Sequence, residues 1–460
     1  MDTILDYVRN ETRSFEEFPF NDADALVFAL LTYDRIPDQV PSLASIEQRY
    51  GTLRARLRAF RLRHPLQSVR TLRRPPFHGL PMEEVQKDVV VWERRHPDIV
   101  QGTTGFVSAE LCHDFYQGAA NNPRYAQILV NAKEEIFSED QQTQFAVETF
   151  LLPNNTIIIS FRGTDDSFVG WREDFNMAYQ YPVPAQRTAC EYVERVAKLW
   201  PQYRIVITGH SKGGNLAVYA GMNVRDDVKD RIERVYSMDG PGFPRNVVDS
   251  YEYSTIVDRV VKIVPESSII GMIMLDPPSE RIVVVKSDAS GIEQHSAFTW
   301  LMDGDRFETV PELSETSQVF NTSLNEWLMG MSQRQREKSV NALFRVLEAS
   351  GRNSVSALVE SPLLSLPRLF GTYVGLDSDE REYLNQAAML VASALRSRPS
   401  AHTESEHTID PDTLEEAVED AVVDKAKDEA AHADGSDEPS ESGKTGAAGQ
   451  TGEASQNPTE

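Results

Sequence analysis

The stretch that most restricts the fold is residues 204–221, RIVITGHSKGGNLAVYAG, in which an apolar run meets a glycine-rich turn and then a helix-forming segment. The turn reads Gly-x-Ser-x-Gly and is centred on Ser211. In this pattern the serine lies on a sharp strand-to-helix turn that lifts its hydroxyl above the edge of a sheet. A Cβ at either flanking glycine would collide with the neighbouring strand or helix. The pattern therefore predicts a nucleophilic serine at the carboxyl end of a central strand; the alternative is a purely structural glycine turn.

Apolar segments of strand length recur on both sides of this turn, and helical segments near 185–200 and at 213–227 alternate with them. Buried apolar strands that alternate with helices indicate an α/β fold, with a mostly parallel sheet covered by helices on both faces. Residues 105–140 read as helices. The predicted strands are 143–152, 156–161, 203–209, 232–240, 259–265 and 281–287.

The chain divides into five predicted parts. The α/β core spans residues 83–315, an N-terminal helical segment (1–47) and an arginine-rich insertion (48–82) precede it, and a C-terminal helical region (316–398) follows. Residues 399–460 have no aromatic side chain and are rich in Ala, Glu, Asp, Ser and Gly, which is typical of a disordered acidic tail.

The insertion holds nine arginines between Arg49 and Arg74 and has no acidic residue from Gln48 to Met82. Leu53, Leu57 and Phe60 recur at a helical spacing, which predicts a basic helix with one apolar stripe. Such a helix is either a solvated surface element or a contact for an anionic surface, such as a membrane or the acidic tail.

Composition limits the classes of function. The net charge of −25 argues against nucleic-acid binding, and residues 401–460 alone contain 17 acidic and 3 basic residues. Only Cys112 and Cys190 occur, without a Cys/His cluster, so neither a disulfide framework nor a structural metal site is expected. The first 18 residues lack the apolar region of a secretory signal, and no run is long enough to span a membrane, so we expect a cytoplasmic protein.

A nucleophilic serine requires a histidine later in the chain, in the order Ser, Asp or Glu, His. The histidines after His210 are His295, His402, His407 and His432. The last three lie in the predicted tail, so His295 is the predicted base. His210 would point away from the turn, and we expect it to pack or to orient its neighbours.

Three carboxylates could orient this histidine. Asp239 ends the strand after the serine, in SMDGPGF, where its short side chain would be firmly positioned. Glu266 ends the following strand, in KIVPESS, which is the commoner place for the acid, and Asp276 is a third choice. Asp239 is favoured, and Glu266 stays open as the alternative.

The site also needs donors for a developing oxyanion. The backbone N–H of Lys212 follows the serine at the helix start and can supply one donor. The second should come from the loop 161–175, FRGTDDSFVGWREDF, through the N–H or the hydroxyl of Thr164.

The motif FRGT, followed by Trp171, Asp174 and GHSKGG, resembles the class 3 lipase group of α/β-hydrolases. A fuller set, which includes DADALVFALLTY, YSMDGPGF, KIVPESSIIGM and SLNEWL, is similar to an Mbeg-like family of bacterial hydrolases over residues 15–350. The resemblance implies an α/β-hydrolase fold and a cytoplasmic serine esterase or lipase that acts on a small-molecule or lipid ester without a cofactor or metal. VPESS stands where secreted lipases carry Asp followed by Val-Pro, and this departure keeps the choice of acid open.

Three functions fit these patterns. The first is ester hydrolysis through an acyl-serine, and the second is acyl transfer by the same residues to another acceptor. The third is a non-catalytic hydrolase fold that serves as a binding protein. Nucleotide binding at GHSKGG is excluded, because the spacing of a phosphate-binding loop is absent.

Overall fold

The structure is a computed structural model, and its described residues all belong to one compact unit within residues 1–398. The predicted disordered tail lies outside the residues that the structure describes. The described residues are 2–34, 37–58, 60, 62–63, 65–73, 79–95, 103–104, 107–354, 357–358 and 362–396.

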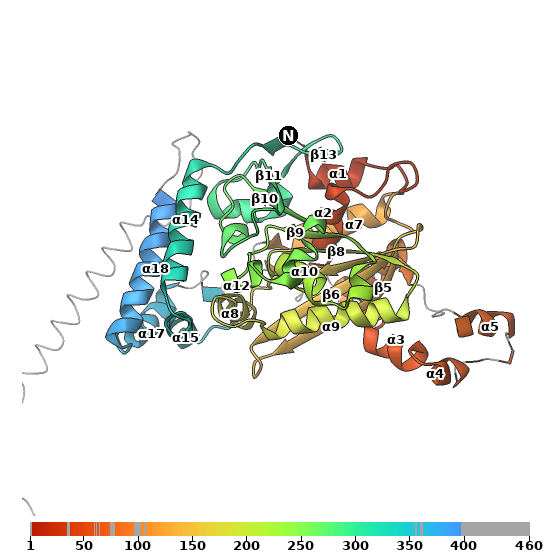
Figure 1. Ribbon diagram of the computed structural model, residues 1–460, viewed down its shortest axis with the longest axis horizontal. Coiled ribbons are helices and arrows are strands. Elements are labelled where there is room, and N and C mark those ends of the chain that lie inside the picture. The colour runs from red at the N-terminus through yellow and green to blue at the C-terminus, as the bar shows by residue number, and fades with distance from the viewer. Residues whose placement is uncertain are drawn as a thin grey trace, which may run out of the picture. The chain divides into compact units, whose positions relative to one another are not determined.

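A mixed sheet of nine strands forms the centre of the described chain, in the order β14-β11-β10-β9-β8-β7-β6-β5-β2 (Figure 1). Neighbours from β7 to β11 run parallel, and the strands at both ends pair antiparallel. The strands are β2 (Leu80–Pro81), β5 (Leu129–Ser138), β6 (Thr143–Leu151), β7 (Thr156–Phe161), β8 (Arg204–His210), β9 (Ile232–Met238), β10 (Val260–Pro265), β11 (Arg281–Val285) and β14 (Thr309–Val310).

The register of the parallel strands brings their carboxyl ends to one edge. Phe161, the last residue of β7, pairs with Gly209, and Met238, the last residue of β9, pairs with His210. The segments that follow β7, β8 and β9 therefore leave the sheet side by side. This is the α/β-hydrolase fold that the sequence predicts.

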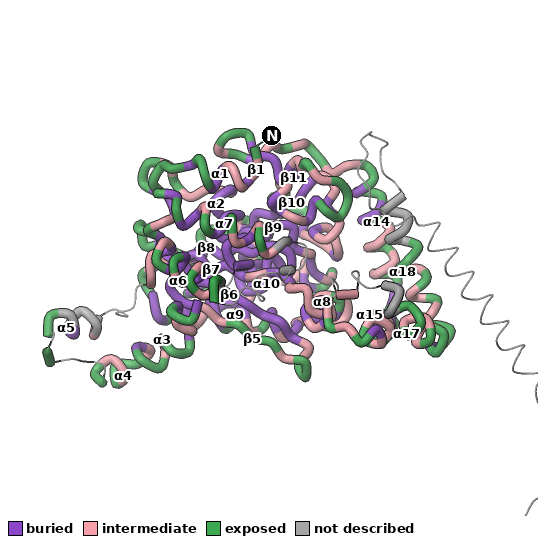
Figure 2. Tube along the Cα trace, turned by 180° about the vertical axis from the view of Figure 1, so that it is seen from behind, coloured by how far each residue is buried: buried purple, intermediate pink, exposed green. Residues whose placement is uncertain are grey.

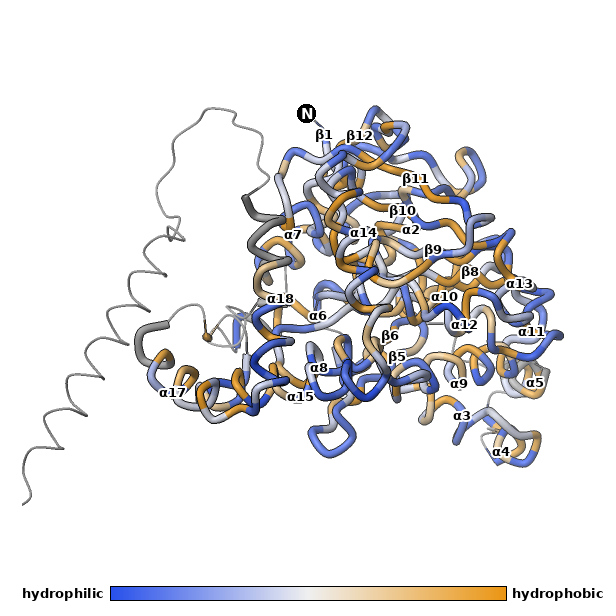
Figure 3. Tube along the Cα trace, turned by 60° about the vertical axis from the view of Figure 1, so that its left-hand side comes forward, coloured by the Kyte–Doolittle hydropathy of each residue, from blue (hydrophilic) through white to orange (hydrophobic). Residues whose placement is uncertain are grey.

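Helices cover both faces of the sheet. The hydrophobic core on one face includes residues of α1 (Ile4–Asn10), α2 (Asp22–Leu31) and α7 (Ala109–Asn121). The core on the other face includes α3 (Leu43–Tyr50), α9 (Pro184–Leu199) and α10 (Lys212–Asn223). Figure 2 shows the strands and the inner sides of these helices as buried, and Figure 3 shows hydrophobic residues along β8 and β10. Both faces are thus closed by apolar packing, as expected for a mainly parallel sheet.

The N-terminal segment is part of this core. Every residue of α2 from Ala23 to Leu31 is buried. The hydroxyls of Ser160 in β7 and Thr208 in β8 donate to backbone carbonyls of α2, at 2.8 and 3.0 Å. These hydrogen bonds satisfy two buried polar groups and fix α2 against the central strands.

The prediction of helices over residues 105–140 is half wrong. α7 lies there, but Leu129–Ser138 forms β5, which pairs antiparallel with β6 over nearly its full length. The charged run Lys133-Glu134-Glu135 gives β5 the composition of a helix surface. Pairing with β6, in which every residue is buried, overrides that weak local preference.

Among the described residues of the arginine-rich insertion, two short helices lie between α3 and β2: α4 (Leu53–Arg58) and α5 (Pro65–Arg73). α4 ends at Arg58, so Phe60 does not continue its stripe, and the predicted three-residue apolar stripe is wrong. Leu53 and Leu57 remain on α4 and are 65% and 55% exposed. The helix therefore presents arginines and leucines to solvent (Figure 2).

The C-terminal region is helical, as predicted. Its helices α14, α15, α17 and α18 lie together beside the sheet (Figure 1). Phe344 of α15 packs with Phe168 of α8 (Phe168–Asn176), which anchors the group to the core. None of the described helices is long and apolar enough to cross a membrane. Their bounds are α14 (Glu315–Gly330), α15 (Gln333–Ala349), α17 (Pro362–Val374) and α18 (Ser378–Arg396).

Candidate active site

Ser211 forms the tight turn between β8 and α10. Its backbone has φ +59° and ψ −130°, a conformation that residues other than glycine rarely adopt. The flanking glycines are required by close approach: a Cβ on Gly209 would lie 2.2 Å from the carbonyl oxygen of Gly213, and one on Gly213 would lie 2.1 Å from that of Phe161. The strained turn aims the serine side chain away from the sheet edge, as the Gly-x-Ser-x-Gly pattern predicts.

A chain of hydrogen bonds begins at this serine. The Ser211 Oγ lies 2.9 Å from Nε2 of His295, and Nδ1 of the same ring lies 2.6 Å from Oδ2 of Asp239. The other carboxylate oxygen of Asp239 accepts from the Ser268 hydroxyl at 2.6 Å. Asp239 is fully buried, and His295 and Ser211 are 3% and 8% exposed. This geometry fits a nucleophile, a base and a carboxylate that orients the base.

Glu266 and Asp276 are not part of this chain. Glu266 follows β10, and within the described residues its side chain makes no hydrogen bond or ion pair with His295. Both carboxylate oxygens of Asp276 accept from Nζ of Lys262, at 2.7 and 2.6 Å. Of the three candidate carboxylates, the structure therefore brings only Asp239 to the histidine.

His210 lies behind His295. Its Nε2 lies 2.8 Å from the backbone carbonyl oxygen of His295, and its Nδ1 lies 2.8 Å from the hydroxyl of Tyr33. Burial, helped by the neighbouring His295, lowers the pKa of His210 to about 3. The ring is therefore neutral and holds the backbone of His295. Tyr33 was not among the predicted site residues, because nothing in its local sequence distinguishes it from core tyrosines.

Thr164 lies in the loop between β7 and α8 and lines the same cavity as Ser211. Its hydroxyl donates to the carboxylate of Asp174, which leaves the backbone N–H as the group of Thr164 that can face a substrate. Burial raises the pKa of the Asp174 carboxyl to about 6, against the opposing effects of the Lys212 ammonium and the Thr164 hydroxyl.

Lys212 offers the predicted backbone N–H and, in addition, a buried side-chain ammonium group. It is the first residue of α10, so its N–H has no partner within the helix. Its ammonium is fully buried and donates to the backbone and side-chain oxygens of Gln144, both at 2.8 Å, and to Glu173 at 3.3 Å. Sequence reasoning missed this role, because a lysine after a surface turn is usually solvated.

A cavity of about 340 Å³ opens at these residues. Ser211, His295 and Thr164 line it, together with side chains of the C-terminal helices. Its volume is within the range of small-molecule sites. In the described part of the chain, no group of three His, Cys, Asp or Glu side chains is placed to hold a metal ion.

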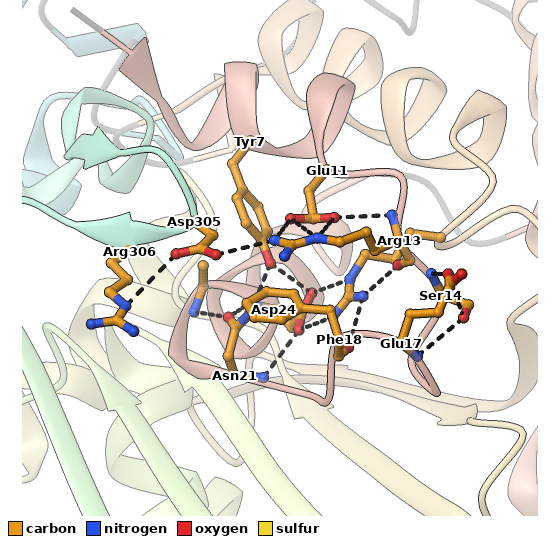
Figure 4. Close-up of polar contacts among 12 residues, drawn as sticks. Tyr7, Glu11, Arg13, Ser14, Glu17, Phe18, Asn21, Asp24, Asp305 and Arg306 are labelled. Atoms are coloured by element: carbon orange, nitrogen blue, oxygen red, sulfur yellow. Dashed lines mark hydrogen bonds and ion pairs between the residues drawn. The ribbon is translucent and has the colours of Figure 1, made fainter.

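A second buried polar cluster shares no residue with this site (Figure 4). Asp24 of α2 accepts from the guanidinium of Arg124 at 2.9 and 2.6 Å, and from the hydroxyls of Tyr125 and Tyr7 at 2.6 and 3.2 Å. These contacts satisfy the buried charge and join α1 and α2 to the segment after α7. The cluster holds the N-terminal helices in place.

The chain was compared with known proteins. Residues 119–345 match the family model described as Mbeg1-like. Among curated proteins, no relative matches the chain.

Fungal lipases are among the solved structures that match, at low identity and low TM-score. The Rhizomucor miehei lipase propeptide complex is 17% identical with a TM-score of 0.28, over 38% of this chain and 67% of that one. Lipase II from Rhizopus niveus is 20% identical with a TM-score of 0.25, over 34% and 66% of the two chains. The Lip2 lipase of Yarrowia lipolytica is 15% identical with a TM-score of 0.25, over 34% and 65%. The matched part of the chain spans about two thirds of the length of these lipases.

Proposed function

We propose that the protein is a serine hydrolase that cleaves acyl esters through an acyl-serine intermediate; the match of residues 119–345 to the Mbeg1-like family model and the α/β-hydrolase fold support this proposal. The observation that carries this proposal is the buried chain of hydrogen bonds from Ser211 through His295 to Asp239. Ser211 and Asp239 each face one nitrogen of the His295 ring, which is the geometry that a nucleophile, a base and an orienting carboxylate need in acyl transfer.

In the proposed reaction, Oγ of Ser211 attacks the acyl carbonyl carbon while Nε2 of His295 takes its proton. The tetrahedral intermediate collapses when the ester C–O bond breaks, and the histidine gives the proton to the leaving alcohol. Water then attacks the acyl-serine by the same steps and releases the acid. Asp239 keeps the histidine proton on Nδ1, so that Nε2 is free to accept.

The backbone N–H groups of Thr164 and Lys212 are the proposed oxyanion donors. The hydroxyl of Thr164 is bonded to Asp174, which fixes the loop so that its N–H can face the carbonyl oxygen. The Lys212 N–H lies at the amino end of α10, where the helix dipole favours a negative charge.

Labelling with a fluorophosphonate probe tests the proposal, because only an activated serine reacts rapidly. We expect the wild type and the exposed control Ser254→Ala to be labelled and to hydrolyse short p-nitrophenyl esters, and Ser211→Ala to do neither. Equal thermal unfolding of the three proteins shows that folding is preserved. An unlabelled wild type would instead favour a non-catalytic binding protein, and ester formation with added alcohols in preference to hydrolysis would favour an acyltransferase.

A further inference from the structure

Part of the wall of the cavity at Ser211 comes from helices that lie 100 or more residues later in the chain. Helices α14, α15 and α18 turn apolar side chains into it, and Ile270 and Phe175 extend the apolar lining toward the serine. A lining of this kind suits a hydrocarbon chain, because each buried methylene contributes to binding. The helix side chains that carry the argument are Phe320, Leu324, Trp327, Val340, Leu343 and Leu384.

This wall is held in place by polar contacts between the helices. The indole N–H of Trp327 on α14 donates to Gln386 on α18 at 2.9 Å. The guanidinium of Arg345 on α15 pairs with Glu380 on α18 at 2.9 Å. These contacts hold the helices that line the apolar chamber against one another.

Among the described residues, one cation lines the chamber without a counter-ion. Arg336 lies in the first turn of α15, and its Nε is buried without a hydrogen-bond partner. Within the described ranges its guanidinium makes no hydrogen bond or ion pair, whereas Lys338 pairs with Asp377 and Arg345 with Glu380. A partly desolvated guanidinium next to apolar walls favours an anionic partner that can accept two parallel hydrogen bonds.

We propose that the substrate is an amphiphilic ester, with one extended acyl chain in the chamber and an anionic phosphate or carboxylate group bound by Arg336. The inference rests on the proposed function, since it names the substrate class of the same serine site. Hydrolysis adds water across the ester bond and releases a long-chain acid and an alcohol, with the anionic group retained on one product.

The chamber is tested by an acyl-chain series on the whole protein, with p-nitrophenyl butyrate, octanoate and laurate. We expect kcat/KM to rise by up to roughly fourfold per methylene until the chamber is full. Leu324→Trp should lower the laurate-to-butyrate ratio at least tenfold, and the matched control Val319→Trp, on the exposed side of α14, should leave it unchanged. The proposed acyl-chain chamber would be wrong if the wild type prefers butyrate, or if the two variants have equal laurate-to-butyrate ratios.

The anion site is tested with monooleoylglycerol, its phosphate monoester, and a p-nitrophenyl ester that ends in a carboxylate, which is compared with its neutral methyl ester. We expect the wild type to prefer an anionic ester to its neutral counterpart. The comparison that gives the larger preference shows whether the bound group is a phosphate or a carboxylate. Arg336→Gln should reduce this preference about 10- to 100-fold, the range for a hydrogen bond to a charged group, and Arg336→Lys should restore part of it.

Arg334→Gln, a substitution of an exposed arginine on the same helix, is the matched control and should keep the preference. An unchanged anionic-to-neutral ratio in Arg336→Gln would overturn the anion site. Both outcomes differ from failure of the proposed function, in which Ser211 is not labelled and no ester is cleaved.

Discussion

Replacement of Asp239 by asparagine separates the proposed acid from its alternative. The Asp239 carboxylate lies 2.6 Å from Nδ1 of His295 and is fully buried, so no water can substitute for it. In Asp239→Asn the amide N–H₂ can face Nδ1 only if that nitrogen loses its proton. The proton then moves to Nε2, which can no longer accept from Ser211.

The size of the effect follows from this change of tautomer. Loss of the correct tautomer in a triad costs about 10⁴ in rate, or about 5 kcal/mol of transition-state stabilisation. Folding should be less affected, because the asparagine oxygen can still accept from Ser268, which donates to Asp239 at 2.6 Å. The effect should therefore appear in kcat rather than in the free energy of unfolding.

The assay is the rate of hydrolysis of a soluble ester by Asp239→Asn and by the matched variant Glu266→Gln, with urea unfolding of both. Glu266 directly follows the neighbouring strand β10, and its side chain makes no hydrogen bond or ion pair with His295 in the described structure, so its amide variant should stay within about threefold of the wild type. If Glu266→Gln loses more activity than Asp239→Asn, the hydrogen bond between Asp239 and His295 is not the catalytic one and the acid lies after β10.

Three further predictions concern folding stability and binding to anionic membranes. Burial lowers the pKa of His210 from 6.5 to about 3, so the stability contributed by its neutral ring is complete above pH 6.5 and is lost as the pH falls toward 3. Between about pH 7 and about pH 5, the urea unfolding free energy should thus fall less for His210→Asn than for the wild type, and equal losses would contradict this. Lys212→Met leaves a buried carboxylate without its ammonium and should lower the unfolding free energy by about 3–5 kcal/mol, whereas an unchanged urea midpoint would show that the network is dispensable. We also propose that the exposed leucines and arginines of α4 bind anionic vesicles weakly at low salt, more strongly after removal of residues 401–460, and not at all in Arg54→Gln/Arg58→Gln. Failure of the tail-deleted protein to sediment with such vesicles would make α4 only a solvated surface.

Local sequence was enough for the features that depend on neighbours in the chain. The turn at Ser211 is defined by glycines within two residues of it, and its strand and helix adjoin it directly. The alternation of apolar strands and helices predicted the central sheet, because burial on both faces requires continuous apolar runs. His295 could be chosen by elimination, since the later histidines all fall in the acidic tail.

The tertiary structure decided the features that depend on which segments meet. Asp239 and Glu266 both end parallel strands, and nothing local distinguishes them; the paths of the chain after β9 and after β11 bring His295 to Asp239. The composition of residues 129–138 suits a helix, and only pairing with β6 makes it a strand. The ammonium of Lys212 contacts Gln144 and Glu173, which are far from it in the sequence. Helices α14, α15 and α18 likewise line a cavity at a serine more than 100 residues earlier in the chain. Pairing and packing over such distances depend on the closed fold, because the groups in contact share no local pattern that could reveal their proximity.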